Sequence, residues 1–186
     1  MMEGHIPPLV AATATVFAAL LFARAALHKL FDFTAFTGFL ADYELVPESA
    51  VRPVAAIVAG AEVAVILTAL VPALHAVSAV LAAGLLLGYA AAMAVNLRRG
   101  RDRVECGCGG AVQPLAWALV WRNAVLAAFV LIGAGASASG FGLAESVVVI
   151  TGGLTVFTAY LLADQIIANA AFIRLKAAGT VVPDEA

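Results

Sequence analysis

Five long apolar stretches, separated by shorter polar segments, dominate the pattern of this sequence. A helix needs about 20 mostly apolar residues to cross the hydrocarbon core of a bilayer, and the five stretches approach or exceed that length. Pro72 is expected to separate the second helix from the third, because proline interrupts helical hydrogen bonding. The pattern therefore predicts membrane-spanning helices at residues 6–30, 52–71, 73–97, 115–132 and 143–173.

Two connections between these helices are longer than a simple turn. Residues 31–51 mix aromatic and acidic side chains, which predicts a short amphipathic segment on the membrane surface. Residues 98–114 contain an arginine-rich stretch followed by both cysteines of the chain. No low-complexity linker interrupts the pattern, so residues 1–186 are predicted to form a single integral membrane domain.

The composition supports a membrane protein, because 64% of the residues are hydrophobic, 12% are charged, and the mean hydropathy is +1.05. Soluble domains contain about 45–50% apolar and about 25% charged residues. We therefore expect an all-α, polytopic membrane helix bundle with four to five transmembrane helices. No basic face carries interleaved aromatic residues, which argues against nucleic-acid binding. The chain has no Lys or Arg before its first apolar stretch, so we interpret this stretch as a retained span.

The cationic residues lie on or near one side of the predicted bundle. With five spans, that side holds the connections 31–51 and 98–114 and the C-terminus. The positive-inside rule places it, and the cysteines, in the cytoplasm. The ten cations are Arg24, Lys29, Arg52, Arg98, Arg99, Arg101, Arg103, Arg122, Arg174 and Lys176.

Cys106 and Cys108 are separated by a single glycine, Gly107. A disulfide across one residue closes a small, strained ring, and strained disulfides are easily reduced. Gly107 can adopt the backbone angles that such a ring requires. The preceding arginines and the positive end of the following helix would favour the reactive thiolate. These features predict a redox-active dithiol.

Two other interpretations of the cysteines remain open. They could be structural residues at a helix boundary, since free cysteine is common in buried positions. They could also bind a soft metal such as copper(I) or zinc, although no other Cys or His lies nearby to complete a zinc set. If they are redox-active, one pair holds one disulfide, so the other thiols in any exchange belong to a partner.

Ionisable residues within the apolar spans form a second group of candidates, because such residues are usually paired or functional. We expect Arg24 to pair with Glu62, and Arg122 to face either Asp164 or the cysteine turn. Pairs that only hold the bundle together are the alternative interpretation. Asn123 lies beside Arg122, and Gln165 lies beside Asp164.

Other residues near the spans are assigned by position. His28 shares a helix face with Arg24 and has a ring that titrates near neutral pH, so His28 and Glu62 are candidate proton carriers. The small-xxx-small pair Gly84 and Gly88 predicts a close helix contact. Three cations near span ends are expected to extend toward the headgroups: Lys29, Arg52 and Arg174.

The stretches ARAALHKLFDFTAFTGFLADYELVP, CGCGG and WALVWRNAVL, with the glutamate of the second span, resemble the methylamine utilization protein MauE family within the wider DoxX-like group. The resemblance covers roughly residues 20–130. Gly109 stands where the family turn usually has Phe, which leaves the thiols in place but calls one partner or quinone contact into question. The matching positions are Arg24, His28, Lys29, Leu30, Tyr43, Pro47, Glu62, Cys106, Cys108, Arg122 and Asn123.

The resemblance implies a role in making the periplasmic methylamine dehydrogenase, whose small subunit is rich in disulfides. It implies a multi-pass protein of the bacterial inner membrane that acts with a thioredoxin-like, MauD-like partner. The arrangement also resembles vitamin K epoxide reductases, from which a quinone follows by analogy as a second redox partner. Their second cysteine pair is missing here, so an internal relay is not expected. A periplasmic client favours a cysteine turn outside the cytoplasm, against the charge rule.

The leading hypothesis is therefore a membrane thiol–disulfide oxidoreductase component that uses Cys106 and Cys108, with His28, Glu62 and Arg122 as supporting residues. One alternative is a non-enzymatic scaffold that holds a thioredoxin-like protein at the membrane. Another is a small-molecule or metal transporter, which the buried charges suggest but which no internal repeat supports.

Overall fold

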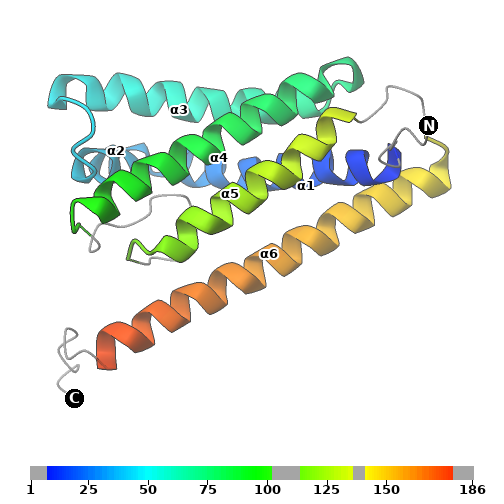
Figure 1. The fold of residues 1–186 in the computed structure, drawn as a ribbon. Coiled ribbons are helices and arrows are strands. Elements are labelled where there is room, and N and C mark those ends of the chain that lie inside the picture. Colours follow the sequence, from blue (N-terminus) through cyan, green and yellow to red (C-terminus); the bar gives the residue numbers. More distant parts are fainter. Residues whose placement is uncertain (1–7, 102–113, 136–140, 178–186) are drawn as a thin grey trace, which may run out of the picture.

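A computed structural model describes residues 8–101, 114–135 and 141–177, with side chains as far as residue 171 and at residue 173. All regular elements within these ranges are helices (Figure 1). In chain order they are α1 (Pro8–Phe31), α2 (Phe33–Asp42), α3 (Glu48–Ala69), the 3-10 helix η1 (Pro72–Leu74), α4 (His75–Arg98), α5 (Trp117–Leu131), the 3-10 helix η2 (Ile132–Gly135) and α6 (Leu143–Ala177).

Five helical segments in the described ranges are long and apolar enough to cross a bilayer. The prediction of an all-α, polytopic membrane bundle is therefore confirmed, and the chain is a multi-pass membrane protein. The five segments are Pro8–Phe31, Glu48–Ala69, Pro72–Arg98, Trp117–Gly135 and Leu143–Ala171.

The helix boundaries differ from the prediction where proline is involved. α3 begins at Glu48 rather than at residue 52, and Pro53 lies inside it. Proline is tolerated near the start of a helix, where few backbone N–H groups have an intrahelical partner. Pro72 does separate α3 from α4, because it opens η1. At the other end of the chain, α6 continues to Ala177.

The connection between α1 and α3 contains a helix of its own, α2. Asp32 caps this helix, and its Oδ1 accepts a hydrogen bond of 2.8 Å from the backbone N–H of Ala35. α2 packs against α3 and buries Phe36, while much of its remaining surface is exposed. A short helical segment at 31–51 is thus present, and its position on the membrane surface stays a prediction.

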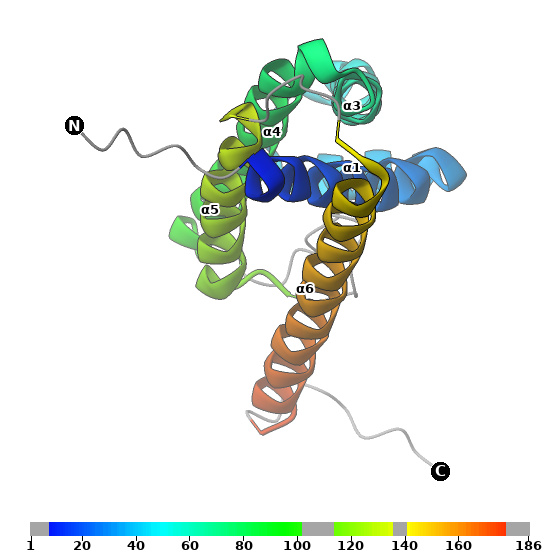
Figure 2. The same ribbon diagram turned by 90° about the vertical axis from the view of Figure 1, so that its right-hand side faces the viewer.

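The helices α1, α3, α4 and α5 pack side by side, and α6 lies outside them (Figures 1 and 2). α6 packs mainly against α1, and its C-terminal end extends away from the other helices in both views. The central core is apolar and includes Phe17, Phe22, Val65 and Leu86. A second, smaller core near the arginine-rich end joins Tyr43, Met93, Leu115 and Leu119.

Close helix contacts occur at other glycines than predicted. Gly84 and Gly88 are exposed, and a Cβ at either position would meet no atom within 4 Å. A Cβ at Gly153 of α6 would instead lie 2.8 Å from Cβ of Val16 on α1. A Cβ at Gly133 of η2 would lie 2.8 Å from Oγ1 of Thr15. The small-residue contacts thus bring α6 and η2 onto α1, and the predicted Gly84–Gly88 contact is wrong.

Candidate functional site

Glu62 is fully buried between α1, α3 and α4, and both of its hydrogen-bond donors bind the same carboxylate oxygen. Lys29 of α1 donates to Oε1 at 2.8 Å, and the hydroxyl of Tyr89 on α4 donates to it at 2.5 Å. Lys29 is as deeply buried as its partner, with 1% of its surface exposed. The expected Arg24–Glu62 pair is therefore wrong, and so is the prediction that Lys29 extends to the headgroups.

Helix geometry explains why Lys29, rather than Arg24, pairs with Glu62. Arg24 and Lys29 are five residues apart, which separates their side chains by about 140° around the helix axis. Lys29 therefore faces α3 while Arg24 faces α6. The aromatic rings of Phe36 and Tyr89 flank the ammonium group, with their centroids 5.0 Å and 5.5 Å from Nζ. Cation–π contact at these distances adds to the stabilisation from the ion pair.

A second ion-pair cluster joins α1, α5 and α6. Arg122 forms a very short ion pair with Asp164, which confirms one of the two predicted orientations of Arg122. Arg24 lies 3.8 Å from the other carboxylate oxygen of Asp164. Two guanidinium nitrogens of Arg122 donate to Oδ1 of Asn123 at 3.3 Å, and the ring of Tyr160 lies 5.8 Å from the guanidinium carbon. Among the described residues, both Arg24 and Arg122 are cationic partners of Asp164, and Lys29 is the cationic partner of Glu62.

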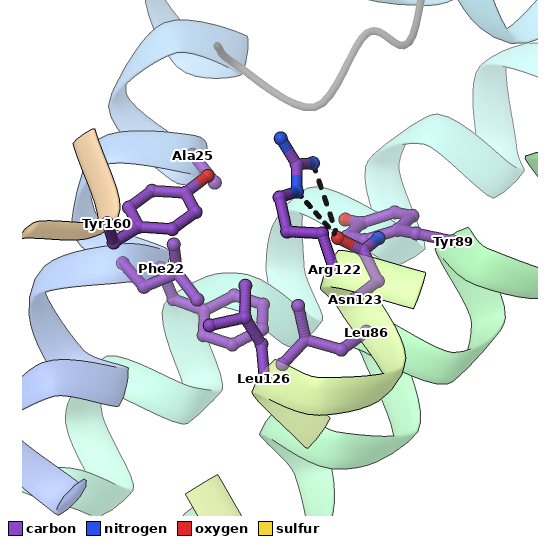
Figure 3. Close-up of a pocket in the computed structure, with 9 residues that line it drawn as sticks. Phe22, Ala25, Leu86, Tyr89, Arg122, Asn123, Leu126 and Tyr160 are labelled. Atoms are coloured by element: carbon purple, nitrogen blue, oxygen red, sulfur yellow. Dashed lines mark hydrogen bonds between the residues drawn. The ribbon is translucent and has the colours of Figure 1, made fainter. Parts of the chain in front are cut away.

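A cavity of about 20 Å³ lies between the two clusters (Figure 3). Its polar lining comes from Tyr89, Arg122, Asn123 and Tyr160, so three helices contribute to it. Its apolar lining includes Phe22, Leu86 and Leu126. A cavity of about 10–15 Å³ with two to four polar partners can hold one water molecule, and this cavity meets both conditions.

His28 lies apart from this buried network. It belongs to the last turn of α1 and is exposed, whereas Glu62 is fully buried. Gln165 is also exposed and donates to Asn169 one turn further along α6. The structure therefore brings together Glu62, Arg122 and Asp164 from the predicted set, but not His28.

Sequence reasoning missed the contribution of Lys29, Tyr89 and Phe36. Tyr89 is the polar side chain in the apolar stretch of residues 79–95 of α4, which is a signal that could have identified it. Lys29 was assigned by its position near a span end. Its burial depends on the break at Asp32, after which α2 places Phe36 near the ammonium group.

Cys106 and Cys108 lie outside the described residues, but both flanks of their segment are described. On one flank, Arg101 forms an ion pair of 2.6 Å with Glu44 and donates to the backbone carbonyl of Asp42. On the other flank, Leu115 packs in the same core as Tyr43. The turn between α2 and α3 therefore contacts the chain before the cysteine segment, and it shares an apolar core with Leu115 after that segment.

Two further features of the turn between α2 and α3 concern its attachment to α4 and its charge near the cysteine segment. Asn96 of α4 is fully buried and donates to the backbone carbonyl of Tyr43 at 3.2 Å. Burial raises the pKa of the Tyr43 hydroxyl, so this hydroxyl stays protonated. The positive charge of Arg101 is partly offset by Glu44, so Arg101 favours a nearby thiolate less than its sequence position suggested.

A larger apolar pocket, of about 430 Å³, lies between α1, α3 and α6. It is lined by Ala12, Val16, Ile66 and Leu70 among others, and by His75 at the start of α4. Nδ1 of His75 is buried and has no hydrogen-bond partner in the described part of the chain. The pocket is thus at the opposite end of α4 from Arg98, after which the cysteine segment follows.

Comparison with known proteins finds one family and several curated relatives. The family described as "Methylamine utilisation protein MauE" matches residues 7–136. The protein "Methylamine utilization protein MauE" of Paracoccus denitrificans is 42% identical over 133 residues, covering 70% of this chain and 72% of the relative. Proteins with the same description from Paracoccus versutus and Methylophilus methylotrophus are 40% and 39% identical over 126 and 108 residues. They cover 67% and 58% of this chain, and 68% and 57% of their own lengths. No solved structure gave a significant match.

Proposed function

The chain belongs to the methylamine utilisation protein MauE family, and on this basis we propose that it is a disulfide-exchange component of methylamine utilisation in the bacterial inner membrane. In this proposal Cys106 and Cys108 exchange a disulfide with a thioredoxin-like, MauD-like partner. The client is the disulfide-rich small subunit of methylamine dehydrogenase. Membership in the family supports the pathway, and the paired cysteines support the chemistry.

The exchange follows the ordinary chemistry of thiols. In the oxidising direction, a partner thiolate attacks the Cys106–Cys108 disulfide, and a mixed disulfide forms while one cysteine leaves as thiolate. A second partner thiolate then attacks the mixed disulfide. The partner departs with a new disulfide, and the chain retains two thiols. An electron acceptor must reoxidise these thiols before the next exchange.

The observation that carries the proposal is the anchoring of the cysteine segment at both flanks. Arg101 before the segment pairs with Glu44 in the turn after α2, and Leu115 after the segment belongs to the same apolar core as Tyr43 of that turn. The two described flanks of the segment therefore lie near the same turn, at one end of the bundle. The buried Asn96–Tyr43 hydrogen bond fixes this turn to α4.

A quinone is the candidate acceptor that the analogy with vitamin K epoxide reductases suggests, and the apolar pocket beside His75 has the lining that such a molecule needs. α4 has 24 residues, so this pocket lies about 36 Å along the helix from Arg98. Thiol oxidation requires contact between the sulfur and its oxidant. We therefore do not assign the acceptor to this pocket.

The transporter alternative receives less support from the arrangement of the charges. Lys29 pairs with Glu62, and Arg122 and Arg24 pair with Asp164. The space between these pairs has room for a water molecule rather than for a larger solute. The exposed side chains of Arg98 and Arg99 are compatible with the scaffold alternative, because they could bind a partner protein without redox chemistry.

Serine substitution of the cysteines separates the redox hypothesis from the scaffold hypothesis. We expect Cys106→Ser and Cys108→Ser, singly and together, to abolish formation of disulfide-bonded, active methylamine dehydrogenase, because a serine hydroxyl cannot form a disulfide. The measurement is dehydrogenase activity and the disulfide content of its small subunit, at matched membrane levels of the variants.

Arg101→Gln combined with Glu44→Gln removes the anchoring ion pair and keeps both thiols, so both hypotheses expect it to reduce maturation, and the double serine variant is the one that separates them. A scaffold would keep activity in the double serine variant and lose it when the anchoring is removed. Full maturation in the double serine variant would therefore exclude disulfide exchange by this chain.

A further inference from the structure

Five polar side chains line one face of α6. Helix geometry places Thr151, Thr155, Thr158, Gln165 and Asn169 within about 80° of one another around the helix axis. All five residues are exposed. We call this group the polar stripe of α6. Polar residues of spanning helices commonly form hydrogen bonds to a neighbouring helix, so an exposed line of them indicates a contact that a single copy of the chain does not make.

The polar stripe faces away from the rest of the bundle. Gly153 lies against Val16 of α1, and Asp164 pairs with Arg122 of α5. Gly153 and Asp164 lie about 200° around the helix axis from the centre of the stripe, which is the opposite side of α6. α6 also lies outside the other spanning helices in Figures 1 and 2. In a single copy of the chain, the stripe therefore faces the acyl chains of the bilayer.

Two residues of the stripe have hydrogen-bonding groups to spare at membrane depth. Asp164 lies 3.8 Å from Arg24, so its neighbour Gln165 is level with a point about two turns before the end of α1. Gln165 donates to Asn169 at 3.1 Å. Within the described part of the chain, this bond leaves the carbonyl oxygen of Gln165 and the amide N–H groups of Asn169 without a partner. Such groups cost free energy when they face lipid.

The three threonines of the stripe have a different role. Each hydroxyl donates to a backbone carbonyl one turn earlier in α6, so none of them needs a partner from outside the helix. Their side chains are small, and small side chains let two membrane helices approach closely. The carboxamides of the stripe can therefore supply the attraction to another helix, and the threonines allow its close approach.

We propose that the polar stripe of α6 is the contact surface for a second copy of the chain, with the two α6 helices parallel in the membrane. Copies that insert with the same orientation are related by a two-fold axis along the membrane normal, so each residue near that axis faces its own counterpart. A carboxamide both donates and accepts, so Gln165 and Asn169 can bind their counterparts. Glu145 and Asp164 of α6 lie off the stripe, so they bring no like charges together at the contact.

This match of the stripe to itself favours a second copy over a helix of another protein. The stripe also lies beyond residues 7–136, the part of the chain that the family match covers. It does not include the cysteines, so the inference stands whether or not the chain exchanges disulfides.

Cysteine crosslinking in cell membranes tests the contact. Two copies with different tags are produced together, both carrying Cys106→Ser, Cys108→Ser and one new cysteine. With a disulfide-forming oxidant, we expect a product that contains both tags for Thr151→Cys and for Leu162→Cys, which lies on the stripe between Thr158 and Gln165. The matched controls are Ile150→Cys and Ala163→Cys, which are exposed at the same depths but lie about 100° or more around the helix. They should give several-fold less of this product.

Energy transfer between donor-labelled and acceptor-labelled copies in lipid vesicles tests the carboxamides. We expect Gln165→Leu combined with Asn169→Leu to raise the protein density needed for half-maximal transfer by about threefold or more, because interhelical hydrogen bonds are lost. The printed hydrogen bond of Gln165 is to Asn169 on the same helix, so this variant keeps the contacts of α6 with the bundle. Ile166→Leu is the matched control and should leave the transfer unchanged.

Three results would overturn the proposal. The first is equal crosslinking at the stripe and control positions, or no product that carries both tags. The second is a product that joins the stripe to another protein and not to a second copy, which would assign the surface to that protein. The third is unchanged energy transfer in the double leucine variant.

Discussion

Lys29 and Glu62 are buried together, and each is tolerated in the apolar interior because the other is there. Removing a charge from water costs several kcal/mol, which the attraction between two close charges offsets only when their geometry is good. Here the 2.8 Å ion pair, the hydroxyl of Tyr89 and the ring of Phe36 all stabilise the charges. Either charge buried here without its partner would lack the stabilisation of the ion pair.

A double-mutant cycle tests this dependence. We expect Glu62→Leu and Lys29→Met alone each to lower the free energy of unfolding by about 3–5 kcal/mol, because each leaves one buried charge unpaired. The double variant should recover most of the loss, since an apolar pair replaces the ion pair. Thermal unfolding in detergent measures the effect. Additive losses in the double variant would contradict the proposed coupling.

At the scale of helices, the close approach of α6 to α1 depends on the absence of a side chain at Gly153. Gly153 lets the backbone of α6 approach Val16, and a Cβ there would lie 2.8 Å from Cβ of Val16. α6 contributes Asp164 to the buried cluster, so its position on α1 also sets the distance between Asp164 and Arg24. The family match covers residues 7–136, so α6 lies beyond it and still completes the charge pairing of the matched region.

Alanine substitution distinguishes a packing glycine from an incidental one. We expect Gly153→Ala to destabilise the chain by about 1–3 kcal/mol, the usual cost of overpacking a close contact. Gly84→Ala should instead be neutral or slightly stabilising, because a Cβ at Gly84 meets no atom within 4 Å and alanine favours helix. Thermal unfolding of both variants in the same detergent makes the comparison. Equal effects at the two positions would show that the α1–α6 contact is not specific to Gly153.

At the scale of the whole molecule, the structure changes which charges count toward membrane orientation. Arg24, Lys29 and Arg122 form ion pairs inside the bundle, so they are not loop charges. Of the remaining seven cations, Arg103 lies outside the described residues and the other six lie at or beyond the end of the bundle where α4 ends, so the positive-inside rule still places that end in the cytoplasm. Direct exchange with a periplasmic client requires the opposite orientation.

Thiol labelling in intact cells decides the orientation. From the charge distribution, we expect a membrane-impermeant reagent to label Cys106 and Cys108 only after the cells are permeabilised. The reaction is measured by mass spectrometry before and after reduction, with a cytoplasmic and a periplasmic cysteine protein as controls. Labelling in intact cells would overturn this orientation and would fit direct exchange with the periplasmic enzyme.

Much of the candidate site could be predicted from the sequence, including the Arg122–Asp164 pair, but the partner of Glu62 could not. Glu62, Arg122 and Asp164 stand out because they are ionisable residues in apolar spans, and all three belong to the buried network. His28 stood out for the same reason and is exposed instead. An ionisable residue in a span is usually paired, but the sequence of that span does not show which residue pairs with it.

The sequence by itself determined that this chain is an α-helical membrane protein with five spans, because hydrophobic length is a local property of each segment. It also determined the family, through residues spread over most of the spans. Only the tertiary structure decided that Glu62 pairs with Lys29 and that Asp164 joins two arginines. Such pairing depends on how each helix is rotated and displaced against its neighbours, and packing between distant segments sets those quantities.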